Sequence, residues 1–360
     1  MEAQQSHFGT LPDGRSVDAI TLMNARGVSA TILSYGATLQ SVIAPDRAGK
    51  GAEITLGHSP LEPYLSKPEY FGSTVGRFAN RIAQGRFMLD GVTYDTPRNN
   101  GTHALHGGVV GFDKLLWEVV EVRAGKDSGH VVLRHTSPDG DQGYPGALMV
   151  TATFSLNEAN VLRIDYAART DRPTVVNITN HAYWNLAGEG SAHGAMGHGL
   201  VIAADSYLPV DAALIPTGER RQVAGTAFDF RQPRMIGERL REAEDQQILF
   251  GRGYDHNWIV QDRVAPVLHG MARLSEPTSG RSLELWSNQP GVQFYSGNFL
   301  DGTTVGRSGR LYRQGDAVVL EPQNFPDAVN RPDFPSARLD PGQEYRNVIE
   351  FRISPGIDPE

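Results

Sequence analysis

Two side chains that could transfer protons occupy unusual places in the sequence. Glu321 follows the apolar run 318–320 and precedes Pro322, so its carboxyl group is expected at the end of a buried strand. A buried carboxylate is costly unless it is paired or protonated. From the residues alone, a structural ion pair and a general base explain Glu321 equally well. His181 lies between the strand-like segment 174–178 and a glycine-rich loop, where a lone histidine is more often structural than catalytic.

Motifs for other common chemistries are missing from the sequence. There is no cysteine, which excludes thiol nucleophiles, thiolate zinc sites and iron–sulfur clusters. Gly49-Lys50 is followed by Gly51 and not by the Ser or Thr of a phosphate-binding loop, and no GxSxG or HExxH motif occurs. His103 and His106 stand three residues apart in a glycine-rich loop, so we expect no metal there. Carboxylate and imidazole chemistry without a cofactor remains.

The elements that must position these groups are mostly β-strands. Apolar and polar residues alternate in 161–170 and in 345–354, and 87–96 forms a predicted hairpin around Asp90-Gly91. Helical patterns are few, at 235–250 and near 61–65. We therefore expect one large antiparallel β domain over residues 1–360, a sandwich or a barrel. Further strands are predicted in 147–156, 174–180, 281–287, 292–300 and 317–323.

Charge and composition limit the partners. The 360 residues carry a formal net charge of −8, which argues against nucleic acid or an anionic membrane surface. No stretch has the unbroken apolar length of a membrane span, and the N-terminus does not resemble a signal peptide. Glycosylation sequons begin at Asn100 and Asn177, within the segments that contain the candidate site residues. Because glycans there would block the site, we do not expect passage through a eukaryotic secretory route. We expect a cytoplasmic protein, with a bacterial periplasm as the open alternative, and oligomeric state is not predicted.

Six segments, in order along the chain, resemble the aldose 1-epimerase (galactose mutarotase) family. The resemblance implies a large antiparallel β-supersandwich with few short helices. It also implies a cofactor-free isomerase that interconverts the α and β anomers of free aldoses such as galactose or glucose. The segments are GRFANRIAQGRF, NGTHALHGG, TNHAYWNLAG, GYDHNWIV, QPGVQFYSGNFLDG and LEPQNFPDAVN.

The same resemblance assigns roles to individual residues. It implies that Glu321 is the general base and His181 the general acid. Of Tyr183 and Trp184, one is expected to pack in the core and the other to face the sugar, and the sequence leaves open which. The family more often has Phe at the position of Trp184, which weighs against a sugar contact from Trp184. The family also often has His near Gln314, a difference that would alter only the pocket rim. His103 and His256 are expected to be structural. Contacts to a monosaccharide are implied for Asn80, Arg81, His106, Tyr183, Asp255 and Gln293. Gln293 is also implied to help position Glu321.

Three other functions fit parts of the pattern. A hexose-6-phosphate 1-epimerase would need extra cations for the phosphate, and no clear cluster stands near Arg77 and Arg86. A non-catalytic carbohydrate-binding protein would be expected to lack Glu321 or His181. A glycoside hydrolase needs two carboxylates, of which Asp255 could be the second.

Overall fold

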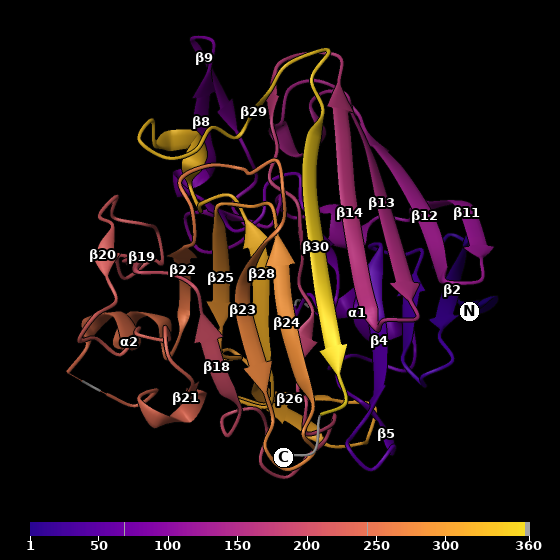
Figure 1. The fold of residues 1–360 in the computed structure, drawn as a ribbon. Coiled ribbons are helices and arrows are strands. Elements are labelled where there is room, and N and C mark those ends of the chain that lie inside the picture. The colour runs from indigo at the N-terminus through magenta and orange to yellow at the C-terminus, as the bar shows by residue number, and fades with distance from the viewer. Residues whose placement is uncertain (68, 243, 357–360) are drawn as a thin grey trace.

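The computed structural model describes residues 1–67, 69–242 and 244–356, and most of its regular structure is β-sheet (Figure 1). Within these residues, three antiparallel sheets form the body of the molecule. The first has five strands in chain order: β1 (Glu2–Thr10), β2 (Ser16–Met23), β3 (Ser29–Leu33), β4 (Thr38–Pro45) and β5 (Gly51–Glu53). The second has nine, in the order β11 (Glu118–Ala124), β12 (Ser128–Ser137), β13 (Leu148–Asn157), β14 (Val161–Thr170), β30 (Tyr345–Ser354), β24 (Ser282–Ser287), β23 (His269–Ser275), β18 (Gly199–Ile202) and β21 (Arg234–Met235). The third has six: β17 (Tyr183–Trp184), β28 (Val318–Gln323), β25 (Gly291–Tyr295), β22 (Asp255–Ile259), β19 (Ser206–Leu208) and β20 (Arg221–Gln222).

Shorter elements complete the described chain. Its two α-helices are α1 (Glu62–Ser66) and α2 (Gln246–Gly251), and neither is long and apolar enough to cross a membrane. Two-stranded ladders pair β6 (Thr74–Val75) with β16 (Thr179–Asn180), β7 (Arg81–Ile82) with β10 (Ala104–Leu105), β8 (Arg86–Leu89) with β9 (Val92–Asp95), β15 (Thr174–Val175) with β29 (Arg338–Leu339), and β26 (Asp301–Val305) with β27 (Leu311–Arg313). Single 3₁₀ turns lie at Ala83–Gly85, Phe112–Lys114, Asp141–Gly143, Ile236–Glu238 and Ala328–Asn330.

The nine-stranded sheet covers both of the other large sheets. In Figure 1, β2 and β4 lie behind the right half of this sheet, and β25 and β28 lie behind its left half. The largest hydrophobic cluster includes Ile20 and Ile32 from the first sheet, Leu133 and Leu285 from the second, and Phe294 from the third. Burying each such side chain contributes roughly 1.5–3 kcal/mol. The predicted all-β supersandwich is therefore confirmed.

The alternation seen in the sequence decides which face of each strand is buried. Along β14, Leu162, Ile164 and Tyr166 are fully buried, whereas Arg163 and Asp165 are partly exposed. The same pattern holds along β13 and β30, and the predicted hairpin is the β8–β9 pair. These strand predictions were correct because half-buried strands repeat with a period of two.

The predicted helix at 235–250 is wrong in extent. Residue 243 lies outside the described residues; around it, the structure has a 3₁₀ turn at Ile236–Glu238 and α2 at Gln246–Gly251. The side chain of Asp245 accepts a hydrogen bond from the main-chain N–H of Gln247 and so caps the start of α2. Arg239 donates to the main-chain carbonyls of Thr226 and Asp229, which ties the segment before α2 to the protein body. The predicted short helix near 61–65 is present as α1.

The six-stranded sheet has one apolar face and one polar face. Trp258, Phe294 and Leu320 point toward the nine-stranded sheet and belong to the main core. Cross-strand pairing places Gln293 directly opposite Glu321, so both lie on the other face. The polar face that carries Gln293 and Glu321 is therefore held in place by the packing of the opposite, apolar face against the core.

Candidate active site

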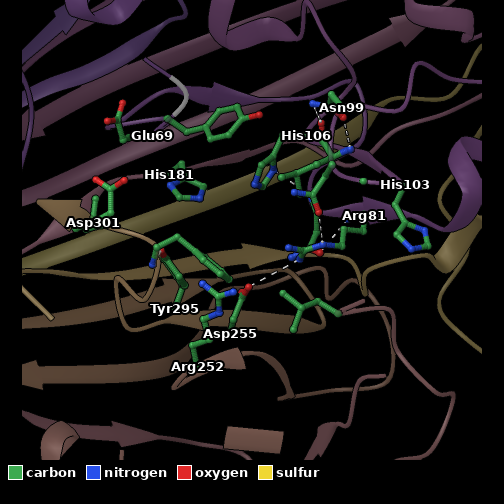
Figure 2. A pocket seen from close by; sticks show the side chains of 18 of the residues that line it. Glu69, Arg81, Asn99, His103, His106, His181, Arg252, Asp255, Tyr295 and Asp301 are labelled. Atoms are coloured by element: carbon green, nitrogen blue, oxygen red, sulfur yellow. Dashed lines mark hydrogen bonds and ion pairs between the residues drawn. The ribbon is translucent and has the colours of Figure 1, made fainter. Parts of the chain in front are cut away.

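A cavity of about 910 Å³ lies over the polar face of the six-stranded sheet. Every residue predicted to act in the site lines this cavity, with the exception of Gln293. Figure 2 shows His106 and His181 next to each other in the cavity, with Arg81 and Asp255 joined by an ion pair. Predicted residues from five of the six motif segments, far apart in the sequence, therefore meet at one place: Asn80, Arg81, His106, His181, Tyr183, Asp255 and Glu321.

His181 and Glu321 face each other at the floor of the cavity. His181 lies in the connection between β16 and β17, and Glu321 lies on β28. Tyr183 on β17 pairs with Val319 on β28, and this pairing brings His181 and Glu321 close together. Nε2 of His181 is 3.7 Å from Oε1 of Glu321, and the exposed fractions of the two side chains are 7% and 2%. The two groups are close enough to act on neighbouring atoms of one substrate.

Burial controls the protonation of this pair. Desolvation lowers the pKa of His181 to about 4. Desolvation also raises the pKa of Glu321 well above its usual value, the charge of Asp255 raises it further, and Arg81 lowers it. Both shifts favour a neutral pair that holds one proton, on the carboxyl group. A carboxylate–imidazolium pair holds the same number of protons, so the pair changes between the two forms without exchange with solvent.

His106 is held in one tautomer by Asn80, the residue that precedes β7. β7 pairs with β10, which brings Asn80 beside His106, and both residues have φ in the left-handed region, +62° and +51°. The main-chain N–H of Asn80 donates to Nδ1 of His106 at 3.1 Å. The ring proton must therefore lie on Nε2. Burial, with the charges of His181 and Arg81, keeps the pKa of His106 well below its usual value. His106 is thus a neutral N–H donor that lines the cavity.

The same tautomer bears on metal binding. Among the described residues, His106, His181 and Glu321 present potential ligand atoms that lie within 4.8 Å of one another. A histidine binds a metal through an unprotonated nitrogen. Both nitrogens of His106 are already committed, Nδ1 to the Asn80 N–H and Nε2 to the proton. The arrangement fits proton transfer better than metal coordination.

Asp255 is an anchored hydrogen-bond acceptor. It begins β22, and Nε2 of Gln293 donates to its Oδ1 at 2.7 Å. Nη1 of Arg81 lies 3.8 Å from Oδ2 of Asp255, and Nε of Arg81 donates to Asn100 at 3.1 Å. Gln293 is therefore placed behind Asp255, and its Oε1 is buried without a partner among the described residues. Arg81 and Asp255 together offer a donor and an acceptor suited to vicinal hydroxyl groups.

Tyr183 and Trp184 point to opposite sides of β17. Tyr183 lines the cavity, and its ring centroid is 5.1 Å from that of His181. Trp184 is fully buried in the main core, 4.7 Å from the ring of Phe351 on the nine-stranded sheet. This separates the two candidates that the sequence left open.

Several neighbouring polar residues have structural contacts. Nδ1 of His103 accepts the main-chain N–H of Gln84 at 3.0 Å. His256 lies on the apolar face, where Nδ1 accepts the main-chain N–H of Asp255 and Nε2 contacts Gln247. Gln314 donates to the main-chain carbonyl of Arg252, a residue of the cavity lining.

The cavity also contains residues that the sequence pattern did not reveal. Tyr295 stands two positions after Gln293 on β25, so the period of two could have placed it on the polar face. Tyr70 comes from a loop, where no pattern indicates which side chains face inward. Charged groups of the lining beyond the predicted residues are Lys67, Glu69, Arg252 and Asp301.

Comparison with known proteins identifies the family of the chain. The family model described as "Aldose 1-epimerase" matches residues 18–352. The chain belongs to the aldose 1-epimerase family. Galactose mutarotase from Mus musculus is 44% identical over 347 residues, which cover 96% of this chain and 97% of the mouse protein. Aldose 1-epimerase from Escherichia coli (strain K12) is 37% identical over 344 residues, which cover 95% of this chain and 96% of that protein.

Solved structures of aldose 1-epimerases have the same fold. Galactose 1-epimerase from Lactobacillus acidophilus superimposes with a TM-score of 0.85 at 29% identity, covering 99% of each chain. An aldose epimerase homologue from C. elegans superimposes with a TM-score of 0.84 at 33% identity, covering 93% of this chain and 98% of its own. As a member of this family, the protein is an isomerase that acts on carbohydrates.

Proposed function

We propose that the protein interconverts the α and β anomers of free aldoses such as galactose or glucose by acid/base opening and closure of the sugar ring. The observation that carries this proposal is the distance of 3.7 Å between Nε2 of His181 and Oε1 of Glu321. The two oxygens on an anomeric carbon are closer together than this distance. One can pair with the carboxylate while the other pairs with the imidazole.

The reaction proceeds through the open-chain aldehyde. Glu321, as the carboxylate, removes the proton of the C1 hydroxyl, and His181, as the imidazolium, delivers a proton to the ring oxygen while the C1–O5 bond breaks. The aldehyde rotates about the C1–C2 bond. The two proton transfers then run in reverse on the other carbonyl face. Each general acid or base contributes typically about 10²–10⁴-fold.

The remaining residues hold the sugar and stabilise charge. Arg81 and the Nε2–H of His106 donate to oxygens on which negative charge develops. Asp255 accepts from sugar hydroxyls, and its bond to Gln293 fixes the position of its carboxylate. Asn80 contributes mainly through its contact to His106, because its side-chain oxygen accepts the main-chain N–H of Arg81.

Free aldoses are favoured over hexose 6-phosphates by the charges of the lining. Lys67 and Arg252 are cations of the lining, but Glu69 and Asp301 line the same cavity. Figure 2 shows Arg252, Glu69 and Asp301. A phosphate site needs convergent cations without competing carboxylates. Polarimetry of galactose, glucose and glucose 6-phosphate under identical conditions separates the two functions. A higher kcat/KM for the phosphorylated sugar would overturn this assignment.

The test of the acid/base pair uses four variants. Glu321→Ala, Glu321→Gln, His181→Ala and His181→Asn should each lower kcat by at least about 100-fold with the fold retained. Mutarotation of freshly dissolved α-galactose is followed by polarimetry, the spontaneous rate is subtracted, and circular dichroism reports folding. A folded variant of either residue with the wild-type rate would refute the roles proposed for the pair.

We also propose that the protein acts in the cytoplasm. Asn177 of the second sequon is fully buried and bonded to the main chain of Ala79 and Asn324, and Asn100 of the first accepts from Arg81 in the cavity lining. Glycans at these positions are incompatible with the structure. Fractionation of the source cells tests the location, and recovery in a periplasmic or secreted fraction would contradict it.

A further inference from the structure

The imidazole of His181 has no conventional hydrogen-bond anchor. Its Nδ1 is buried and makes no hydrogen bond of standard geometry to any residue that the structure describes. The other buried histidines of this region differ, because Nδ1 of His106, of His103 and of His256 each accepts a main-chain N–H. A histidine that moves protons is normally oriented by a partner on its second nitrogen. No other described residue therefore fixes the His181 ring through a standard hydrogen bond to Nδ1.

Aromatic rings surround this imidazole. The ring centroid of Tyr70 lies 5.7 Å from that of His181 and 4.8 Å from that of His106, in the second case with an interplanar angle of 62°. His106 lies 5.2 Å from His181 on one side, and Tyr183 lies 5.1 Å from it on another. Tyr70 is the ring that contacts both histidines, and such ring pairs are stabilising beyond the area that they bury.

The turn that carries Tyr70 is bonded to the main chain of His181. Gly72 donates its main-chain N–H to the carbonyl of His181 at 2.9 Å, and His181 donates its own to the carbonyl of Ser73 at 2.9 Å. The side chain of Asn180 donates to the Gly72 carbonyl at 2.7 Å. Movement of the turn and of His181 is therefore coupled at the main chain as well as at the rings.

The conformation of this turn is tightly constrained. Tyr70 has φ of +60° and Gly72 has φ of +67°, both in the left-handed region. A Cβ atom on Gly72 would overlap the main-chain oxygen of Leu39, so this position requires glycine. Non-glycine residues held in this region cluster at functional sites, where the surroundings enforce them. The turn fixes the Tyr70 side chain at the wall of the cavity.

We infer that Tyr70 is a positioning residue that holds the His181 imidazole toward Glu321 by ring packing. This inference rests on the proposed role of His181 as the acid. The aromatic ring is the part of Tyr70 that matters, because the orientation comes from contact with the two imidazoles. A role of the hydroxyl as a sugar ligand is the competing explanation, and it makes the opposite prediction for phenylalanine.

The kinetic test compares Tyr70→Phe, Tyr70→Leu and Tyr70→Ala. Phenylalanine keeps the ring and should retain kcat within about 2-fold, whereas leucine and alanine should lower kcat by about 10- to 100-fold, because small misplacements of a catalytic group are costly. KM for galactose should change by less than about 3-fold in all three. Tyr94→Ala is the matched control, since Tyr94 is a partly buried ring stacked on Phe87 outside the cavity and its loss should leave kcat unchanged.

A spectroscopic test does not depend on activity. Ring nitrogen NMR of histidine-labelled protein, with His181 assigned by its disappearance in His181→Ala, should show one well-defined environment for His181 in the wild type and in Tyr70→Phe. Tyr70→Ala should broaden or shift this signal and leave the signal of His256 in place. An unchanged His181 signal in folded Tyr70→Ala would overturn the inference.

The outcomes separate this inference from the proposed function. If folded His181→Ala keeps the wild-type rate, the acid/base assignment fails, and the positioning role fails with it. If His181→Ala is inactive but Tyr70→Ala keeps wild-type kcat, only the positioning role fails. If Tyr70→Phe loses as much activity as Tyr70→Ala, the hydroxyl is the important group and ring packing is refuted.

Discussion

Gln293 contacts Asp255 from a position behind the cavity, through a hydrogen bond of 2.7 Å from Nε2 to Oδ1. Gln293 is also the direct cross-strand neighbour of Glu321. Its amide therefore lies next to both carboxylates of the floor, but it bonds to only one of them. With the proposed roles, Gln293 therefore supports the residue that binds the sugar and makes no hydrogen bond to the proposed base.

Gln293→Ala should raise KM for galactose by about 10-fold and change kcat by less than about 3-fold, because a hydrogen bond to a charged group contributes roughly 1.5–3 kcal/mol. The substitution frees the Asp255 carboxylate, which in its proposed role binds the sugar in the ground state and in the transition state alike. Initial rates of mutarotation over a range of galactose concentrations provide the measurement. A fall in kcat at constant KM would instead mean that Gln293 acts on Glu321.

The pH dependence of kcat/KM should follow the buried pair. Activity requires one proton on the pair, and a second proton is added at His181, whose pKa is lowered by burial to about 4. The acid limb should therefore lie near pH 4, and the activity should be lost at high pH as Glu321, whose pKa is raised, gives up the proton. Polarimetric rates corrected for the buffer reaction test this profile. An acid limb with its half-maximal kcat/KM near the ordinary histidine value of 6.5 would contradict it.

Asp113→Asn should stabilise the protein, and the gain should grow with pH. Burial raises the pKa of Asp113 from 3.8 to about 6, and Lys114 lowers it by a smaller amount. As pH rises from about 4 to about 6, the unfolded chain ionises Asp113 before the folded protein does, so stability falls with rising pH. A pKa difference of this size corresponds to at most about 3 kcal/mol. Urea denaturation at pH 4 and at pH 8 measures the gain, and an equal gain at both pH values would rule out this explanation.

Gly72→Ala should reduce the free energy of unfolding by roughly 3 kcal/mol or more, because the new Cβ both strains a left-handed conformation and meets Leu39 O. Gly91→Ala is the matched control, since Gly91 has φ of +78° in the β8–β9 turn with no atom within 4 Å of the new Cβ. The control should lose only about 1–2 kcal/mol. Denaturant unfolding of both variants gives the comparison, and equal losses would show that the clash is relieved elsewhere.

The sequence predicted the fold where half-buried strands are long. β14, β13 and β30 each contain ten residues, and burial alternates along most of β14 and β13 and along 349–354 of β30, where apolar and polar residues also alternate in the sequence. β1 was not predicted, because its side chains are nearly all exposed or partly exposed and no alternation results. The prediction of a helix at 235–250 was wrong in extent because the spacing of apolar residues contains no information about the cap at Asp245 or the tertiary contacts of Arg239.

The site depended more on resemblance than on residue patterns. β16 and β17, which flank His181, have two residues each, too few for a periodic signal. The meeting of Arg81 with Asp255 depends on strand pairings between distant segments, which local patterns do not encode. The motif resemblance named these residues, and the structure supplies the distances, the His106 tautomer and the opposite orientations of Tyr183 and Trp184.

Burial of the His181–Glu321 pair has a consequence for the course of the reaction. With the proposed roles, ring opening leaves a protonated Glu321 and a neutral His181, because each has exchanged a proton with the sugar. This is the protonation state that desolvation favours in the empty cavity. The cavity is therefore best matched to the short-lived aldehyde and less well to either ring form. The open-chain aldehyde is common to the α and the β anomer. A cavity whose protonation state suits the aldehyde therefore lowers the barrier to ring opening from either anomer.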